Sequence, residues 1–413
     1  MNVVPDRPVR GVAFAFTGRF VARAAAALTV VLLLSGVVPA IAGEGAPLFD
    51  FYGFIRLDAV IDDSAVNHNQ YVMWALTEDA RVNPKDDAHI EIYPRVTRFG
   101  FKSAVQDLTG DVRLSGRIEL DFQNGGTESR ETPRMRLAYL DLAYRAWTAR
   151  LGQDWDLISP LYPGVHTDGI LWNAGNVGDR RPQARVTWSR SGVDAAVAAG
   201  PTGAVDNQDL DKDGERDGAA SALPFVQGRI GVTADTWVEK ETVRAGAWGY
   251  YAREDTRGAI AGHRDFESWV VGFDASMPLT SRLRVEGEAW MGTNLSDLRG
   301  GIGQGVNTFT GEEIESMGAW AQIAARVHSQ WTTYAGASVD DPKDEDVPSV
   351  SDVTPETLSS VGRTRNWTVF ASGRYRPWTP FQIGLEYYYW VTEYNGLGDG
   401  VDNRLDLHFS YIF

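Results

Sequence analysis

The stretch Arg404-Leu405-Asp406-Leu407-His408-Phe409-Ser410-Tyr411-Ile412-Phe413 alternates between apolar and polar side chains along almost its whole length. Successive side chains of an extended strand point to opposite faces, so Leu405, Phe409 and Phe413 share one face. The polar members of the stretch lie on the other face: Arg404, Asp406, His408 and Ser410. The pattern predicts an amphipathic β-strand whose apolar face becomes aromatic toward its end.

A strand that ends on a terminal aromatic residue is typical of the last strand of bacterial outer-membrane barrels. We therefore expect the barrel-assembly machinery to recognise the chain through Phe413. Ten residues alone leave a second interpretation open, an ordinary amphipathic edge strand of another kind of β-protein, so the rest of the chain has to decide.

Segments with the same alternation recur through the chain and predict about sixteen strands, an even number within the range of bacterial single-chain barrels. One strand shows the pattern most clearly, with Val112, Leu114 and Ile118 on one face and Arg113 and Arg117 on the other. The expected strands are residues 49–61, 95–104, 111–122, 134–144, 148–156, 183–189, 193–200, 224–234, 242–253, 266–277, 282–294, 315–327, 331–340, 364–376, 381–394 and 404–413.

The connections between these segments alternate between short turns and longer polar loops, seven of the former and eight of the latter. Sixteen strands with both ends on one side of a membrane need these numbers. The sequence therefore predicts an all-β fold, a transmembrane antiparallel β-barrel of about 16 strands. Many tryptophans, among them Trp237, Trp248 and Trp290, are expected near strand ends or on outward faces, in aromatic girdles.

The first 42 residues read as a signal peptide, and residues 43–413 as the barrel. Arg7, Arg10, Arg19 and Arg23 precede an uncharged run, and Ala40-Ile41-Ala42 supplies a cleavage pattern of small residues. The chain has no cysteine, which excludes a disulfide framework and thiolate metal sites. Its net charge of −16 disfavours nucleic acid as a partner, because the phosphate backbone is also negatively charged.

The loop predicted at residues 157–182 is the third long one, and its glycines and prolines allow sharp bends. We expect it to fold inward and to form a charged pore constriction with the facing wall, where opposed charges sort solutes. Arg98, Arg113 and Arg117 should oppose Asp156, Asp168 and Asp179, whereas Arg299 should lie outside the lumen. The full predicted set is Arg56, Arg98, Lys102, Arg113, Arg117, Asp156, Asp168, Asp179, Arg180, Arg181 and Arg185. Alternatively, the wall arginines pair with Glu119 and Asp121 and only hold the wall together.

A second acidic segment, Asp209-Leu210-Asp211-Lys212-Asp213-Gly214-Glu215-Arg216-Asp217, resembles the first half of a calcium-binding loop. Asp209, Asp211, Asp213 and Asp217 are the expected ligands. The acid expected at the twelfth position is replaced by Ala220, so a solvated acidic loop remains the alternative. We expect no required cofactor, and the six histidines show no ligand spacing.

Several short motifs resemble the DcaP-type outer-membrane porins, in the expected order over roughly residues 49–190. They are Arg98-Phe99-Gly100-Phe101, Glu119-Leu120-Asp121-Phe122, Arg136-Leu137-Ala138-Tyr139, Leu151-Gly152-Gln153-Asp154-Trp155 and Arg181-Pro182-Gln183-Ala184-Arg185. The resemblance implies a homotrimeric sixteen-stranded barrel, in contact with outer-membrane lipid and lipopolysaccharide, that passes small hydrophilic solutes, often anions such as dicarboxylates.

The sequence thus favours a non-enzymatic channel for passive diffusion in the cell outer membrane. A barrel-embedded hydrolase of the phospholipase kind is the first alternative, although no serine–histidine pair stands at a diagnostic spacing. A structural or adhesive barrel without channel activity is the second. Stepwise ion conductance separates the channel from both.

Overall fold

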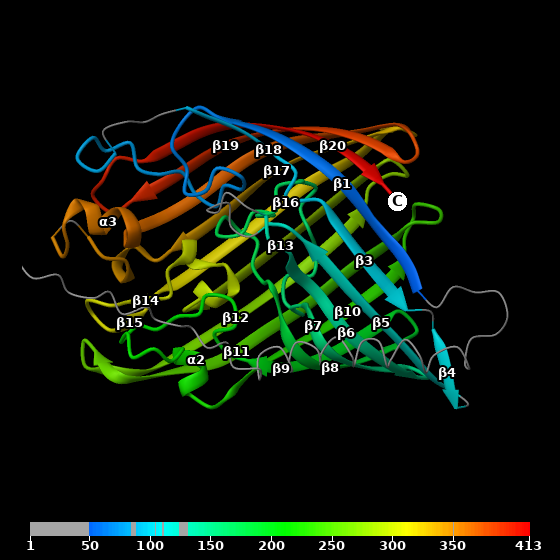
Figure 1. Cartoon of the computed structure of the whole chain (residues 1–413), viewed down its shortest axis with the longest axis horizontal. Helices are drawn as coiled ribbons and strands as arrows, with labels where there is room; N and C mark the ends of the chain where they lie inside the picture. Colours follow the sequence, from blue (N-terminus) through cyan, green and yellow to red (C-terminus); the bar gives the residue numbers. More distant parts are fainter. Residues whose placement is uncertain (1–48, 84–87, 104, 110, 124–130, 350) are drawn as a thin grey trace, which may run out of the picture. The chain divides into compact units, whose positions relative to one another are not determined.

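The computed structural model describes residues 49–413 except 84–87, 104, 110, 124–130 and 350. The predicted signal peptide lies outside these residues. The described chain forms one antiparallel sheet that closes on itself, because the first strand pairs with the last (Figure 1). Among the described residues, no helix is both long enough and apolar enough to cross a membrane.

The barrel has sixteen strands, as predicted. In chain order its segments are β1 (Phe49–Asp62), β2 (His89–Tyr93), β3 (Arg98–Ser103), β4 (Gln106–Thr109), β5 (Val112–Asp121), β6 (Arg134–Tyr144), β7 (Trp147–Trp155), β8 (Arg180–Arg190), β9 (Val193–Pro201), β10 (Pro224–Asp235), β11 (Thr242–Ile260), β12 (His263–Pro278), β13 (Leu283–Thr293), β16 (Glu315–His328), β17 (Trp331–Pro342), β18 (Arg363–Trp378), β19 (Phe381–Tyr394) and β20 (Gly400–Ile412).

The second barrel strand is interrupted, which the sequence did not predict. β2 and β3 both pair with β1, and β3 and β4 both pair with β5, so the three segments occupy one place in the sheet. Pro94 follows β2 directly, and proline has no N–H to donate to a ladder. Pairing with β1 begins as early as His89, inside the region expected to be loop.

Four small elements in the long loops were also not predicted. They are the helices α2 (Asp217–Ala220) and α3 (Pro355–Val361) and the hairpin of β14 (Val306–Asn307) with β15 (Glu312–Glu313). α3 starts with Pro355 after Thr354, whose hydroxyl caps the helix by accepting from the Thr357 N–H. Its seven residues are too few for an amphipathic repeat to be recognisable in the sequence.

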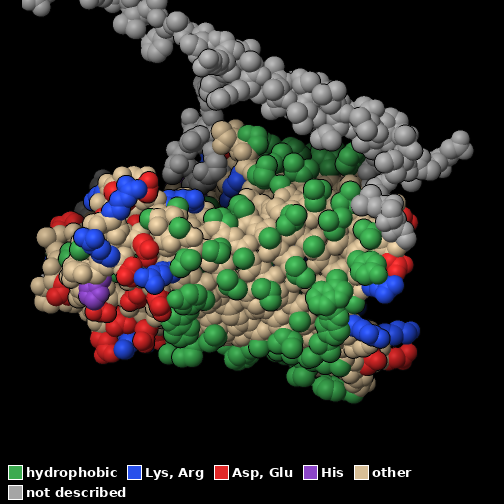
Figure 2. All heavy atoms as spheres, turned by 90° about the horizontal axis from the view of Figure 1, so that it is seen from below, with side chains coloured by type: hydrophobic (Ala, Val, Ile, Leu, Met, Phe, Trp, Pro, Cys, Tyr) green, Lys and Arg blue, Asp and Glu red, His purple; other side chains and the backbone are tan. Residues whose placement is uncertain are grey.

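The two faces of the wall differ as the alternation predicts. In β1, Ile55, Leu57 and Ile61 are exposed on the outside, whereas Arg56 and Asp58 are buried on the inside. Figure 2 shows apolar side chains spread over the middle of one outer face and charged side chains gathered at its two ends. In a closed barrel the backbone N–H and C=O groups of every strand can pair with those of its neighbours. Such a barrel with an apolar outer band suits a lipid environment.

Not all tryptophans follow the predicted outward pattern. Trp237 is exposed, but Trp248 and Trp290 are buried on the inward face. The Trp290 indole Nε1–H donates to the Gly175 carbonyl at 2.8 Å, which places this ring against the loop between β7 and β8. The packed core of the protein therefore lies inside the barrel, between that loop and the wall.

Candidate functional site

The loop between β7 and β8, residues 156–179, is called the third loop below. Backbone N–H groups along it donate to side chains that point inward from four strands, β10, β13, β16 and β19. The pairs are Leu157 to Gln227 at 2.9 Å, Leu161 to Glu288 at 2.7 Å, Gly164 to Gln322 at 2.6 Å and His166 to Glu386 at 2.9 Å. The third loop therefore follows the inner surface of the wall from β10 to β19, and inward acceptors satisfy its backbone.

Asp168, further along the third loop, meets arginines of the first strands. Its carboxylate lies 2.8 Å from the Arg134 guanidinium and 3.3 Å from that of Arg136. Arg98 approaches it less closely, at 4.0 Å. Burial raises the pKa of Asp168, but the positive charges of Arg134 and Arg136 outweigh this effect and hold the pKa below its usual value. Asp168 is therefore a carboxylate at neutral pH.

A cavity of about 500 Å³ lies beside the third loop, between Asp168 and the wall of β1, β3, β5, β6 and β7. Its charged lining consists of six arginines, three carboxylates and one histidine. They are Arg56, Arg98, Arg117, Arg136, Arg150, Arg374, Glu119, Asp154, Asp168 and His166. Burial lowers the pKa of His166 to about 4, so this side chain is neutral at pH 7. The cavity thus has three more positive than negative charges, although the whole chain has a net charge of −16.

Two of these arginines are incompletely paired. The shortest distances from Arg98 to carboxylate oxygens are 3.7 and 4.0 Å, and its Nε–H has no hydrogen-bond partner in the described part of the chain. Arg374 has no ion pair with any described carboxylate; its Nε–H donates instead to the neutral His166 ring at 3.1 Å. Its two Nη groups donate over 3.4 Å to the Tyr334 hydroxyl and the Val165 carbonyl, which are uncharged acceptors. A guanidinium without a close carboxylate is the donor that a small anion pairs with.

The acids and arginines predicted to oppose one another across the lumen are only partly brought together. Asp168 faces Arg98 as expected. Asp156 instead pairs with Arg181 at 2.9 Å, and Asp179 pairs with Arg299 at 3.0 Å. The prediction of a row of three opposed acids was therefore wrong. Arg299, expected to lie outside the lumen, is instead a partner of the third loop. The N–H groups of Asn173 and Gly178 also donate to the carbonyls of Arg299 and Leu298, at 2.8 and 2.7 Å.

The other predicted wall residues divide between cavity and structural contacts. Arg56 and Arg117 line the cavity, but Arg56 is paired with Asp58 and Arg117 with Glu119. Only the Arg117–Glu119 pair is one that the alternative interpretation named. Arg180, Arg181 and Arg185 hold Asp179, Asp297 and Asp154, in that order. Lys102 lies over the Tyr52 ring at 4.7 Å, and Arg113 is exposed; neither lines the cavity.

Sequence reasoning missed Arg134, Arg136, Arg150 and Arg374. β6 gave mixed faces in the sequence because its pairing with β5 shifts by one residue between Glu119 and Leu120. Such a bulge turns both Arg136 and Leu137 to the buried side, and simple alternation fails there. The available signal in the sequence was the spacing of Arg134 and Arg136, because residues two apart in a strand share one face.

The acidic segment predicted to bind calcium brings three of its four expected ligands together. Carboxylate oxygens of Asp209, Asp211 and Asp217 lie within 4.8 Å of one another. The Asp213 carboxylate lies instead 3.4 Å from Arg257. Calcium binding by this loop stays a prediction.

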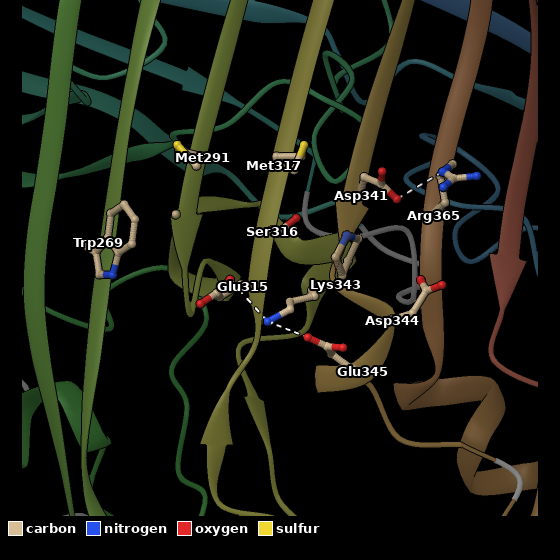
Figure 3. Close-up of a pocket in the computed structure, with 12 residues that line it drawn as sticks. Trp269, Met291, Glu315, Ser316, Met317, Asp341, Lys343, Asp344, Glu345 and Arg365 are labelled. Carbon is tan, nitrogen blue, oxygen red and sulfur yellow. Dashed lines mark hydrogen bonds and ion pairs between the residues drawn. The ribbon is translucent and has the colours of Figure 1, made fainter.

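A groove of about 590 Å³ at the outer surface offers a contrast to the cavity (Figure 3). Its carboxylates outnumber its cations, and both cations are paired. Lys343 lies 2.7 Å from Glu345, and Arg365 lies 3.0 Å from Asp341. This groove therefore does not suit an anion.

No protein-family model and no curated protein matches the sequence. Solved structures do share the fold. The outer-membrane channel DcaP of Acinetobacter baumannii aligns with a TM-score of 0.70 at 18% identity, over 88% of this chain and 97% of that one.

Two further barrels align with a TM-score of 0.58 at 11% identity. The anion-selective porin of Comamonas acidovorans covers 88% of this chain and 99% of its own. OmpF of Salmonella typhi, in complex with daunomycin, covers 88% and 97%. The predicted resemblance to DcaP-type porins is thus confirmed at the level of the fold, and the chain from Phe49 to Phe413 is a sixteen-stranded barrel of the porin type.

Proposed function

We propose that this protein is an outer-membrane channel for passive diffusion of small hydrophilic solutes. The closed barrel, its apolar outer band and its likeness to porins support this function. The third loop, which follows the inner wall from β10 to β19, narrows the passage.

The channel prefers anions, including small dicarboxylates. The observation that carries this proposal is the positively lined cavity, with Arg98 and Arg374 incompletely paired. Inside a narrow lumen such charges are less screened than at the surface, where the Debye length is about 8 Å at physiological salt. A dicarboxylate has two groups that accept forked donors from guanidinium. One structural neighbour is named an anion-selective porin, which supports the same conclusion.

Planar-bilayer recording tests the proposal. We expect stepwise conductance and, across a KCl gradient, a reversal potential on the anion side. Arg98→Gln with Arg374→Gln should move the reversal potential toward cations and weaken block by a dicarboxylate such as succinate. Arg145→Gln is the matched control, because this exposed arginine lies in the turn between β6 and β7, beside Asp111. No conductance would refute the channel. Conductance with unchanged selectivity in the double variant would refute only the anion preference.

We also propose that three copies assemble into a homotrimer, and that lipopolysaccharide and the barrel-assembly machinery are the other partners of the protein. The resemblance to DcaP-type porins supports the trimer. One neighbour of the same fold is OmpT of Vibrio cholerae, which has been solved in a trimer form. It aligns with this chain with a TM-score of 0.51.

A further inference from the structure

A cluster of buried acids and histidines lies where the barrel closes, between β1 and β20. Asp58 on β1 is directly opposite His408 on β20 in the ladder. Asp406 is two residues before His408 and therefore faces the same side. Ligand atoms of Asp58, Asp406 and His408 all lie within 4.8 Å of one another. All three side chains are fully buried.

Two members of this cluster have no hydrogen-bond partner among the described residues. Both carboxylate oxygens of Asp406 and both ring nitrogens of His408 lack a hydrogen bond. The two neighbouring arginines form their ion pairs with other carboxylates: Arg56 pairs with Asp58, and Arg404 pairs with Asp62 at 2.8 Å. A buried carboxylate without a donor is strongly unfavourable, so it requires either a proton or a cation.

The surroundings hold the His408 ring in one place. Gly384 is its neighbour in the β19–β20 ladder, and any side chain at Gly384 would overlap the ring. From the third loop, the His166 ring lies against it at 3.8 Å between centroids. His166 and Arg56 also line the 500 Å³ cavity, so the cluster lies directly behind a space that a small ion can enter.

We propose that Asp58, Asp406 and His408 bind one divalent transition-metal ion of the zinc type. A set of one imidazole nitrogen and two carboxylates suits such ions, whereas calcium and magnesium prefer oxygen ligands alone. The ion links the first strand to the last and stabilises barrel closure. This site does not depend on the channel function proposed above.

Equilibrium dialysis of the full barrel in detergent, after removal of metal with EDTA, tests the site. Zn²⁺ should bind at one equivalent per chain. It should also raise the temperature at which the band of the folded barrel on SDS gels is replaced by the band of the unfolded chain. Asp406→Asn and His408→Gln should each weaken binding at least tenfold and abolish the shift. These measurements use an Asp209→Ala, Asp211→Ala background, which removes two of the three clustered carboxylates of the acidic loop.

Two matched controls should bind zinc as the parent barrel does. Asp340→Asn changes a buried inward carboxylate that already accepts from Ser316 at 2.7 Å. His328→Gln changes an exposed histidine at the end of β16. Equal zinc affinity in the Asp406→Asn and His408→Gln variants, called the seam variants, and in the controls would overturn the proposal. The absence of zinc binding in the acidic-loop background would also overturn it. If the seam variants do not fold, the parent barrel decides: one equivalent of Co²⁺ should give visible absorption from nitrogen and oxygen ligation, and its absence would overturn the site.

Discussion

Asp168 is the residue that connects the third loop to the positive wall. It contacts Arg134 and Arg136, which come from a strand whose pairing contains a bulge. The same two arginines contact Asp121 at 2.8 and 2.7 Å. The Asp168 carboxylate thus adds a negative charge from the third loop to the network of Arg134, Arg136 and Asp121 on the wall.

Replacing Asp168 by Asn should loosen the third loop and make the cavity more positive. Removing one partner of a buried ion pair costs about 3 kcal/mol, because the remaining charge stays buried. We expect lower stability in urea and a stronger anion preference in a salt gradient. Asp111→Asn, which removes an exposed turn carboxylate, should change neither property. An Asp168→Asn barrel as stable as the parent would contradict this role.

The stability contributed by Asp168 should depend on pH only in acid. Its pKa in the folded protein lies below the ordinary value of 3.8, so the unfolded chain takes up the proton first as the pH falls. The contribution is therefore fully present above about pH 4 and is lost as the pH falls further. The difference in unfolding free energy between parent and Asp168→Asn should stay constant from about pH 5 to 8. A difference that disappears above pH 5 would contradict the depressed pKa.

Among the elements, β20 closes the barrel. Phe413, just after it, exchanges backbone hydrogen bonds with Gly53 at 3.0 and 2.9 Å. Its ring stacks on Phe51 with 5.1 Å between centroids. Closure therefore depends on Phe413, just beyond the strand, as well as on the ladder.

Phe413→Ala should lower stability by about 1 kcal/mol beyond the loss of buried area, because an aromatic pair is lost. It should also slow insertion by the assembly machinery. Phe273→Ala, which removes an exposed outward ring from the middle of the sheet, is the control. Urea midpoints and surface levels measure the two effects. Equal midpoints for the two variants would show that the Phe51–Phe413 stack contributes nothing to closure.

The acidic loop before α2 should bind calcium weakly, in the range of about 10⁻⁴–10⁻³ M that is known for extracellular modules. Asp209, Asp211 and Asp217 already point their oxygens toward one another. Calorimetry should show binding heat for the parent chain and none for an Asp209→Ala, Asp211→Ala variant. Equal heats would leave this segment a solvated acidic loop.

The whole molecule combines an acidic chain with a local positive cavity. The net charge of −16 is a property of the entire sequence, whereas solutes meet the field of the few charges around a narrow space. Composition alone would have argued against an anion channel. The placement of six arginines around one cavity argues for it.

At the scale of the assembly, we expect three copies to associate. Native mass spectrometry in detergent should give three times the mass of one chain, and heating should release monomers. A single-chain mass under conditions that retain the folded barrel would contradict the trimer. Conductance in three equal steps per insertion would support it independently.

Local alternation of side chains was enough to predict the number of barrel strands and the closed sheet, although not the interruption of the second strand or the bulge in the pairing of β6. The side-chain period of a strand is two residues, so both faces can be recognised from neighbours in the sequence. The sequence also pointed to the third loop through its length, glycines and prolines. Arg98 and Asp168 were correctly expected to lie near each other.

Contacts between distant segments could not be predicted in the same way. His166 and Glu386 are 220 residues apart and meet because the third loop follows the wall as far as β19. Three features depend on strand register and loop path. They are the pairing of Asp156 with Arg181 of β8 and not with an arginine of the first strands, the bulge that turns Arg136 inward, and the cluster of Asp58, Asp406 and His408. Alternation determines which face a residue occupies, but only three-dimensional closure of the barrel determines which residues meet on that face.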